Sequence, residues 1–413
     1  MDGEPLLEPE RLRRYADAIV KAGVALRRGD TLVVRGEHAH RELVVAVVES
    51  AYRAGAHAVE AQTHDPLVTR ARLRYGRDDA LGSITPWAKQ RLRELAKPGS
   101  ALVYLAGEAE HGYLDGIAPR RIRVDAERTA AHTRAFQRAS IEMRVPWTIA
   151  AWPTNYWAGL VYPELPAHEA KRRLAGDLLR FCRLTDEDGP GASGWLKHVR
   201  AIGRRAARLT RLDLARLELR GPGTALDLRM APGTRWLGGA EKTSAGATIT
   251  PNMPTEETYT SPHAGGAEGT FACTFPLSLH GRLIEGLRGE LRGGRLVRLQ
   301  AGRRNDRDFV AAYLDSDRTG NGRRLGEVAL VDATSRIGQS GRTYFTTLLD
   351  ENAATHIAFG QGFSQTRDAR PLRGVNNSSV HLDVMIGGQD LEATGVTAKG
   401  RRVPLVRDGL WRI

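Results

Sequence analysis

The sequence predicts an α/β N-terminal domain with a mostly parallel sheet over residues 1–211, followed by a β-rich α+β C-terminal domain over residues 212–413. Two observations support this. A chain of 413 residues is longer than one ordinary hydrophobic core needs. In addition, the spacing of apolar residues changes near Leu214, from helical segments alternating with short β-branched runs to short alternating strands with glycine turns.

Helices and strands alternate through the first 160 residues. Residues 11–26 place apolar side chains three and four apart, as an amphipathic helix does, and residues 31–35 (Thr-Leu-Val-Val-Arg) are typical of a buried strand. The alternation continues with expected helices at 41–53, 84–96 and 121–142 and expected strands at 57–62, 101–106 and 146–151. Strands separated by helices favour a parallel sheet covered on both faces.

The expected elements become mostly strands after two further helices, at 168–184 and 193–211. Residues 215–230 alternate around a Gly-Pro-Gly turn, which predicts a β-hairpin. Short strands follow to about residue 300, with a helix at 306–316 and strands towards the C-terminus. Within that last part we expect one more helix, which begins at the acidic pair Asp350-Glu351 and ends at Gly360.

Composition indicates a soluble protein. The hydrophobic content of 41% and the charged content of 26% are ordinary for a globular chain, and no apolar run approaches the roughly 20 residues that span a bilayer. Cys182 and Cys273 both lie in apolar settings and are expected to be buried free thiols in a reducing compartment. With no signal-peptide pattern at the N-terminus, the expected location is cytoplasmic, without membrane association.

The net charge of +13 raises the question of nucleic-acid binding. Only seven of the 61 basic residues are lysines, a skew that indicates the codon bias of a GC-rich genome rather than selection for phosphate contacts. No zinc-finger, RNA-recognition or helix-turn-helix pattern occurs, so no nucleic-acid partner is expected. No phosphate-binding loop follows the strands either, and His38 and His40 are expected in a solvent-exposed strand-to-helix loop rather than in a metal site.

Acidic and imidazole side chains stand in short, well-defined settings in the C-terminal half. These are Glu257 in Pro-Asn-Met-Pro-Thr-Glu-Glu, Glu327 in Leu-Gly-Glu-Val-Ala-Leu-Val, His356 in Ala-Ala-Thr-His-Ile-Ala, and His381 and Asp383 in Val-His-Leu-Asp-Val-Met. Three carboxylates and two imidazoles form a ligand set suited to two divalent first-row metal ions. If these side chains converge, the C-terminal domain binds metal and the chain is a metallohydrolase.

Each of these residues also has an ordinary structural interpretation. His381 and Asp383, two apart in a strand, would share one face, but an edge strand would place them there too. His356 can be a hydrogen-bonded helical histidine, and Glu257 can belong to a proline-stiffened surface turn. Glu327 leads a buried strand and needs a partner, either a metal or one of Arg323 and Arg324.

The four motifs, in this order, resemble those of the thermophilic aminopeptidase family. The resemblance is strongest from about residue 220 to 410 and looser before that. It implies a metal-dependent aminopeptidase that removes N-terminal residues from peptides with two divalent ions (Zn, Co, Mn or Mg) and forms a homodimer. It also implies that Glu257, Glu327, His356, His381 and Asp383 are the metal ligands.

One position departs from the family. Seven residues after His356, where the family has a tyrosine near the metals, this chain has Phe363. A phenyl ring cannot donate a hydrogen bond to a developing oxyanion, a loss that typically costs about 10²–10³ in rate. Either another group, with Tyr344 as the candidate, takes over this role, or the chain is a metal-binding homologue with weak or altered peptidase activity.

The expected mechanism is attack on the peptide carbonyl by a water activated between two metal ions. Five protein ligands hold two ions only if one carboxylate is shared, and Glu257 and Asp383 are the two candidates. Glu256 is a candidate general base. The alternative is a ring-cleaving dioxygenase on the same scaffold, because His356, His381 and Asp383 alone form the two-His-one-carboxylate set of mononuclear non-haem iron.

Overall fold

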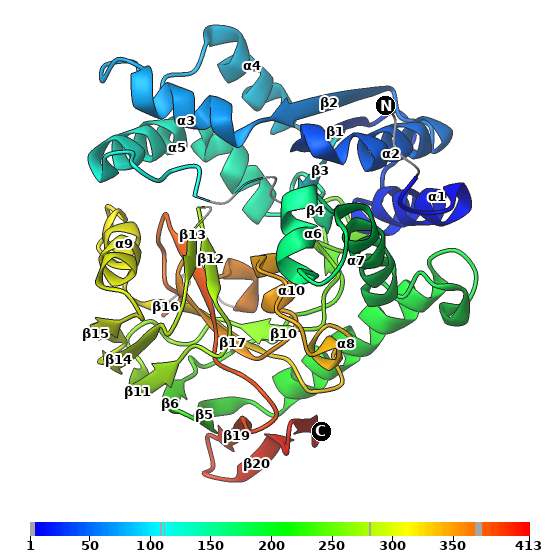
Figure 1. The fold of residues 1–413 in the computed structure, drawn as a ribbon. Coiled ribbons are helices and arrows are strands. Elements are labelled where there is room, and N and C mark those ends of the chain that lie inside the picture. Colours follow the sequence, from blue (N-terminus) through cyan, green and yellow to red (C-terminus); the bar gives the residue numbers. More distant parts are fainter. Residues whose placement is uncertain (1–4, 108–109, 111, 281, 368–373) are drawn as a thin grey trace. The chain divides into compact units, whose positions relative to one another are not determined.

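The computed structural model describes residues 5–107, 110, 112–280, 282–367 and 374–413 (Figure 1). The chain divides into two compact units. One consists of residues 1–198 and 240–254, and the other of residues 199–239 and 255–413. The division at 198/199 falls inside helix α8 (Ser193–Arg211), and the segment 240–254 belongs to the first unit although residues on either side of it belong to the second.

The first unit is an α/β fold around a parallel sheet. Its helices are α1 (Pro9–Ala18), α2 (Arg41–Arg53), α3 (Pro66–Tyr75), α4 (Pro86–Leu95), α5 (Pro119–Ile141), α6 (Asn155–Val161) and α7 (Ala167–Phe181). Its strands are β1 (Thr31–Glu37), β2 (Ala58–His64), β3 (Ser100–Ala106), β4 (Trp147–Ala151), β7 (Glu241–Lys242), β8 (Thr248–Ile249) and β9 (Asn252–Met253). Among the described residues the main sheet runs β2-β1-β3-β4-β9 with every pair parallel, which confirms the predicted parallel sheet.

Apolar side chains on the parallel sheet explain its helical cover. Leu95 of α4 and Ala139 of α5 are buried with Val33 of β1 and Leu102 of β3 in one hydrophobic cluster, while α2 packs against β1 and β2. Strands with apolar residues on both faces require such cover on both sides. Sequence periodicity did not predict α3, α6 or the strand β9.

The second unit is mostly antiparallel. Its strands are β5 (Leu214–Gly221), β6 (Thr224–Arg229), β10 (Thr258–Thr260), β11 (Ala267–Ala272), β12 (Leu277–Leu279), β13 (Arg282–Ile284), β14 (Arg288–Arg292), β15 (Arg295–Gln300), β16 (Leu325–Leu330), β17 (His356–Gly360), β18 (His381–Met385), β19 (Glu392–Thr397), β20 (Arg402–Arg407) and β21 (Leu410–Trp411). Its helices are α9 (Arg304–Asp315) and α10 (Thr347–Asp350). The β-rich second domain is therefore confirmed, and the expected hairpin is the pair β5–β6.

Two sheets of the second unit enclose its core. In the described part of the chain, the larger sheet runs β15-β14-β11-β6-β5-β19-β20-β21 and the smaller one β10-β16-β17-β18. Side chains from both sheets and from α9 join one hydrophobic cluster, in which the rings of Phe271 (β11) and Phe359 (β17) lie 5.5 Å apart. One face of the four-stranded sheet is thus buried in the core, and its other face is available for polar groups.

The expected helix from Asp350 to Gly360 is wrong. Helix α10 ends at Asp350, and the residues from His356 to Gly360 form strand β17. Ile357 and Phe359 point into the core, so the apolar side chains of this segment follow the period of two that a strand requires. The acidic pair 350–351 obscured this, because it is also a common helix-start signal.

Other sequence expectations concern cysteines, histidines and membrane spans. Cys182 and Cys273 are both free, as predicted, but only Cys182 is fully buried and Cys273 is partly exposed. His38 is exposed, as expected, but the expected exposure of His40 is wrong. His40 is buried because its ring has backbone partners: its Nδ1 accepts from the Glu37 amide, and its Nε2 lies 2.8 Å from the Gly107 oxygen. Among the helices of the described residues, none is both long and apolar enough to cross a membrane.

Candidate metal centre

The four-stranded sheet brings the predicted acidic and imidazole residues onto one face. Glu327 on β16 pairs with Ala358 on β17, and Ala358 pairs with Asp383 on β18. Paired residues in a sheet point to the same side, as do residues two apart in one strand. His356 is two residues from Ala358, and His381 is two residues from Asp383. Both histidines therefore lie with Glu327 and Asp383 on the face opposite the core.

A β-bulge orients Glu327. Leu325 pairs with Phe359 on the core face, and the register shifts before Glu327 pairs with Ala358 on the other face. The additional residue is Gly326, where a Cβ would lie 2.3 Å from the Gln361 oxygen, so the close approach of these two backbones requires glycine. Without the bulge, Leu325 and Glu327 would share one face. The bulge lets a core leucine and a site carboxylate stand two residues apart.

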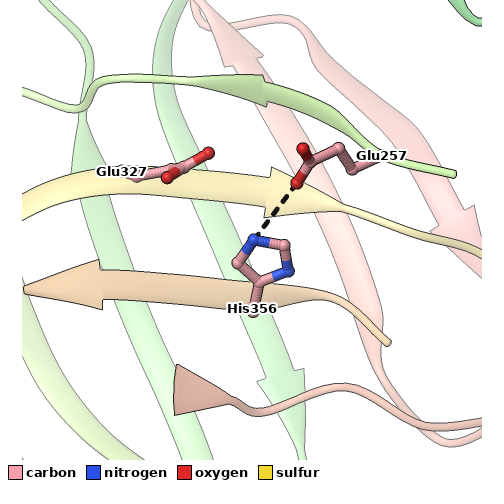
Figure 2. A group of neighbouring side chains, drawn as sticks. All are labelled: Glu257, Glu327 and His356. Atoms are coloured by element: carbon pink, nitrogen blue, oxygen red, sulfur yellow. Dashed lines mark ion pairs between the residues drawn. The ribbon is translucent and has the colours of Figure 1, made fainter. Parts of the chain in front are cut away.

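The side chains on this face contact one another. His356 Nε2 lies 3.2 Å from a Glu257 oxygen, and His381 Nε2 lies 3.3 Å from Glu327 and 3.1 Å from Asp383. Figure 2 shows Glu257 on the segment leading into β10, Glu327 on β16 and His356 on β17, with the imidazole joined to the Glu257 carboxylate. The small side chain of Ala358, between Glu327 and Asp383, leaves room at the centre of the row.

Burial differs across the cluster. The exposed fraction of the side chain is 1% for His356, 5% for Glu327 and 10% for Glu257, but 32% for His381. A backbone oxygen holds the imidazole of His381 in place, because its Nδ1 lies 3.0 Å from the Gln361 oxygen. The His381 side is therefore where a molecule from solvent can reach the cluster.

Concentrated negative charge changes the ionisation of these groups. Burial, together with the charge of Glu257, raises the pKa of Glu327 to about 7. Burial alone would lower the pKa of His356, but the hydrogen bond and charge of Glu257 raise it to about 10. Burial would likewise lower the pKa of His381, yet Asp383 raises it well above its usual value. Protons on the two imidazoles and divalent cations are alternative ways to balance this charge, so cations and protons compete for the site.

The donor atoms fit divalent metal ions. Among the described residues, three groups place one donor atom from each member within 4.8 Å of the others: Glu257, Glu327 and His356; Glu327, His381 and Asp383; and Glu351, His356 and Asp383. The first two groups contain all five predicted residues and have only Glu327 in common. Mixed carboxylate and imidazole sets of this kind suit Zn, Co or Mn.

Glu351 is the member that sequence reasoning missed as a candidate ligand. It is buried, and burial with the charge of Asp383 raises its pKa well above the usual value. In the sequence it looked like part of a helix start. The signal in the sequence for a ligand role was the position of Glu351, five residues before His356. In the structure Glu351 lies in the short run between helix α10 and strand β17.

Glu256 and the arginines lie in other environments. The backbone N–H of Glu256 donates to Asn352, and its carboxylate accepts from the Arg336 amide at 3.3 Å; Glu256 is in none of the three donor groups found among the described residues. Arg323 pairs with Asp315, and Arg324 donates to the backbone oxygens of Ala264 and Gly293. Glu327 thus lies beside His381, and the two arginines have other partners.

Comparison with known proteins decides the family. The sequence profile of the thermophilic metalloproteases (M29) matches residues 8–411. The chain belongs to the M29 family of thermophilic metalloproteases. Its family membership, predicted from the four motifs, is confirmed, and with it the prediction of a hydrolase.

Relatives in the M29 family are similar over their whole length. Aminopeptidase T of Thermus aquaticus is 34% identical over 98% of this chain and 99% of that protein. Aminopeptidase 2 of Geobacillus stearothermophilus is 33% identical over 97% and 98%. The solved structure of wild-type AmpT from Thermus thermophilus superposes with a TM-score of 0.88 at 32% identity, covering 98% of this chain and 99% of that one. These names give the dioxygenase alternative no support.

Proposed function

We propose that this M29 chain is a metal-dependent aminopeptidase that hydrolyses N-terminal residues from peptides with two divalent ions. The observation that carries the proposal is the pair of donor groups that share Glu327 and otherwise have no member in common. Two three-donor sites joined by one carboxylate are the arrangement that two neighbouring ions need. The names of the relatives reported above supply the substrate class.

Each residue then has a role that follows from its position. Glu257 and His356 would hold one ion and His381 and Asp383 the other, with Glu327 shared between them. Glu351, beside His356 and Asp383, is an additional carboxylate donor. When bound, the ions would polarise the scissile carbonyl and lower the pKa of a bound water towards neutrality. Glu327 therefore replaces Glu257 and Asp383 as our candidate for the shared carboxylate.

The surrounding protein keeps this face in order. The Gln361 oxygen fixes the orientation of the His381 imidazole, and such second contacts usually determine how well a histidine binds metal. The core residues behind the sheet keep the strands that carry the donors in register. The role of Glu256 as general base stays a prediction. In the structure its carboxylate accepts a hydrogen bond from the backbone N–H of Arg336.

The test combines metal analysis with a substrate panel. Purified protein equilibrated with Zn²⁺, Co²⁺ or Mn²⁺ and then dialysed should retain two equivalents and cleave aminoacyl-p-nitroanilides. A chelator should abolish cleavage, and added metal should restore it. Acetylation of the substrate amine should prevent cleavage if the enzyme requires a free N-terminus. A single bound iron with oxygen uptake on a dihydroxypyridine would contradict the proposal.

A further inference from the structure

Tyr259 lies on the same face of the sheet as the metal-binding side chains. It pairs with Ala329 of β16, and Ala329 pairs with His356 of β17, so the three residues form one row across the strands. Tyr259 also follows Glu257 by two residues, and residues two apart in an extended segment point the same way. The small side chain of Ala329 between Tyr259 and His356 leaves room for the phenol ring above the sheet.

Ring contacts connect Tyr259 to the accessible side of the site. The rings of Tyr259 and Phe363 are 5.1 Å apart at an interplanar angle of 62°, and those of Phe363 and His381 are 5.7 Å apart at 66°. The Phe363 amide donates to the Ser261 hydroxyl at 2.9 Å, which fixes this loop to the end of the strand carrying Tyr259. Tyr259 is only 8% exposed, so its ring has a defined position against Phe363, the ring that contacts the solvent-facing imidazole.

Peptide hydrolysis at this site places negative charge on the carbonyl oxygen, which a hydrogen-bond donor would stabilise in addition to the ions. As the water oxygen bonds to the carbonyl carbon, the π electron pair moves onto the carbonyl oxygen. That pair re-forms the C=O bond when the C–N bond breaks, and the leaving amine takes the proton that the water has lost. Phe363 reaches His381 with a phenyl ring that has no donor, whereas the ring packed against it, Tyr259, carries a hydroxyl.

We propose that Tyr259 is a catalytic residue whose phenol hydroxyl donates a hydrogen bond to this oxyanion. The inference rests on the proposed aminopeptidase function and adds to it a residue that the metal ligands do not include. Tyr344, the candidate from the sequence, is fully buried and its amide donates to Asp350. Tyr259 is preferred because it has both the register and the ring contact that connect it to the ligand face.

The experiment compares tyrosine-to-phenylalanine variants of the full-length protein loaded with Co²⁺ or Zn²⁺. Tyr259→Phe should lower kcat on aminoacyl-p-nitroanilides by about 10²–10³ with little change in KM, because the lost hydrogen bond forms only in the transition state. Tyr344→Phe and the control Tyr104→Phe, which lies on β3 of the parallel sheet, should keep kcat within about threefold. In the Tyr259→Phe background, Phe363→Tyr should restore part of the activity.

A second measurement does not depend on turnover. An α-aminoalkylphosphonate, a tetrahedral anion that resembles the transition state, should bind Tyr259→Phe about 10- to 100-fold more weakly by calorimetry, while metal content and Tm stay at wild-type values. A fall in metal content in Tyr259→Phe would show a structural role and overturn the inference. So would a loss of kcat in Tyr344→Phe with none in Tyr259→Phe.

The outcomes separate the two proposals. A wild-type protein that cleaves no anilide at two bound equivalents of metal would remove the aminopeptidase function, and the role of Tyr259 with it. A wild-type protein that cleaves anilides while Tyr259→Phe keeps kcat within about threefold would remove only the role of Tyr259.

Discussion

At the residue scale, Glu327 is the most informative position in the cluster. It is the one residue common to the two donor groups that together hold all five predicted ligands, and it is 5% exposed. Glu327→Gln keeps the shape of the side chain and removes its charge. We expect the variant to retain fewer than two equivalents of metal after dialysis, because both donor groups lose a carboxylate.

The Glu327→Gln protein should still fold. A neutral amide removes the repulsion from Glu257 but also weakens the pairing with His381. These two effects oppose each other, so the Tm without added metal should stay close to that of wild type. Added Zn²⁺ should raise the Tm of wild type, since a ligand bound to the native state stabilises it, and should raise that of the variant less. Glu392→Gln, a half-exposed carboxylate on β19, is the control. Unchanged metal occupancy in Glu327→Gln would remove Glu327 from the site.

Which site residues the sequence could predict depended on their settings. His381 and Asp383, two apart in an apolar strand, indicated their shared face directly. Glu351 looked like a helix start, and no sequence pattern singled out Tyr259. Their positions depend on pairing between strands that are distant in sequence, such as Tyr259 with Ala329, and a single sequence does not contain that register.

At the element scale, Asp317 holds the segment that leads into β18. It follows α9, and its carboxylate accepts from the amide and hydroxyl of Ser379, two residues before His381. Burial opposes ionisation, but these bonds and those from Thr319 and Asn321 lower the pKa of Asp317 to about 2. One buried carboxylate thereby fixes the start of a strand that carries two candidate ligands.

Asp317→Asn should lower the free energy of unfolding by about 1–3 kcal/mol at pH 7. A carboxyl with a lowered folded-state pKa stabilises the fold above its unfolded pKa of about 3.9 and loses this effect as the pH falls through the folded value. The difference between wild type and variant should therefore shrink from pH 5 towards pH 2 in urea unfolding. Asp315→Asn, which breaks a pair with Arg323 from a side chain 53% exposed, should cost less than about 1 kcal/mol. A difference that does not change with pH would contradict this account.

Most elements of the first unit and the β-rich nature of the second followed from periodicity, since helices and strands there have clear apolar spacing. The strand β17 did not, because its five residues are few and follow Ala353 and Ala354 in a run that also satisfies a helix. The bulge at Gly326 was equally hidden: it shifts the register between Leu325 and Glu327, and only the partner strand reveals that these two residues face opposite ways.

At the scale of the whole molecule, we expect a homodimer, and the first unit carries surface that fits this expectation. Val68 and Tyr75 on α3 are 67% and 79% exposed, and Trp87 on α4 is 67% exposed; both helices pack against α5. Large apolar side chains exposed on neighbouring elements are typical of protein–protein interfaces.

Sedimentation equilibrium should give twice the 45.2 kDa mass of the chain. The dimer should also persist at high salt, because salt does not screen apolar contacts. Salt does screen the electrostatic repulsion between two chains that each carry a net charge of +13. The double variant Tyr75→Lys/Trp87→Lys should be monomeric, since two buried cations without partners would oppose association. Val297→Lys, at a residue 52% exposed on β15 of the other unit, should remain dimeric. A monomeric wild type would contradict the expected dimer, whereas a dimeric double variant would place the interface on another surface.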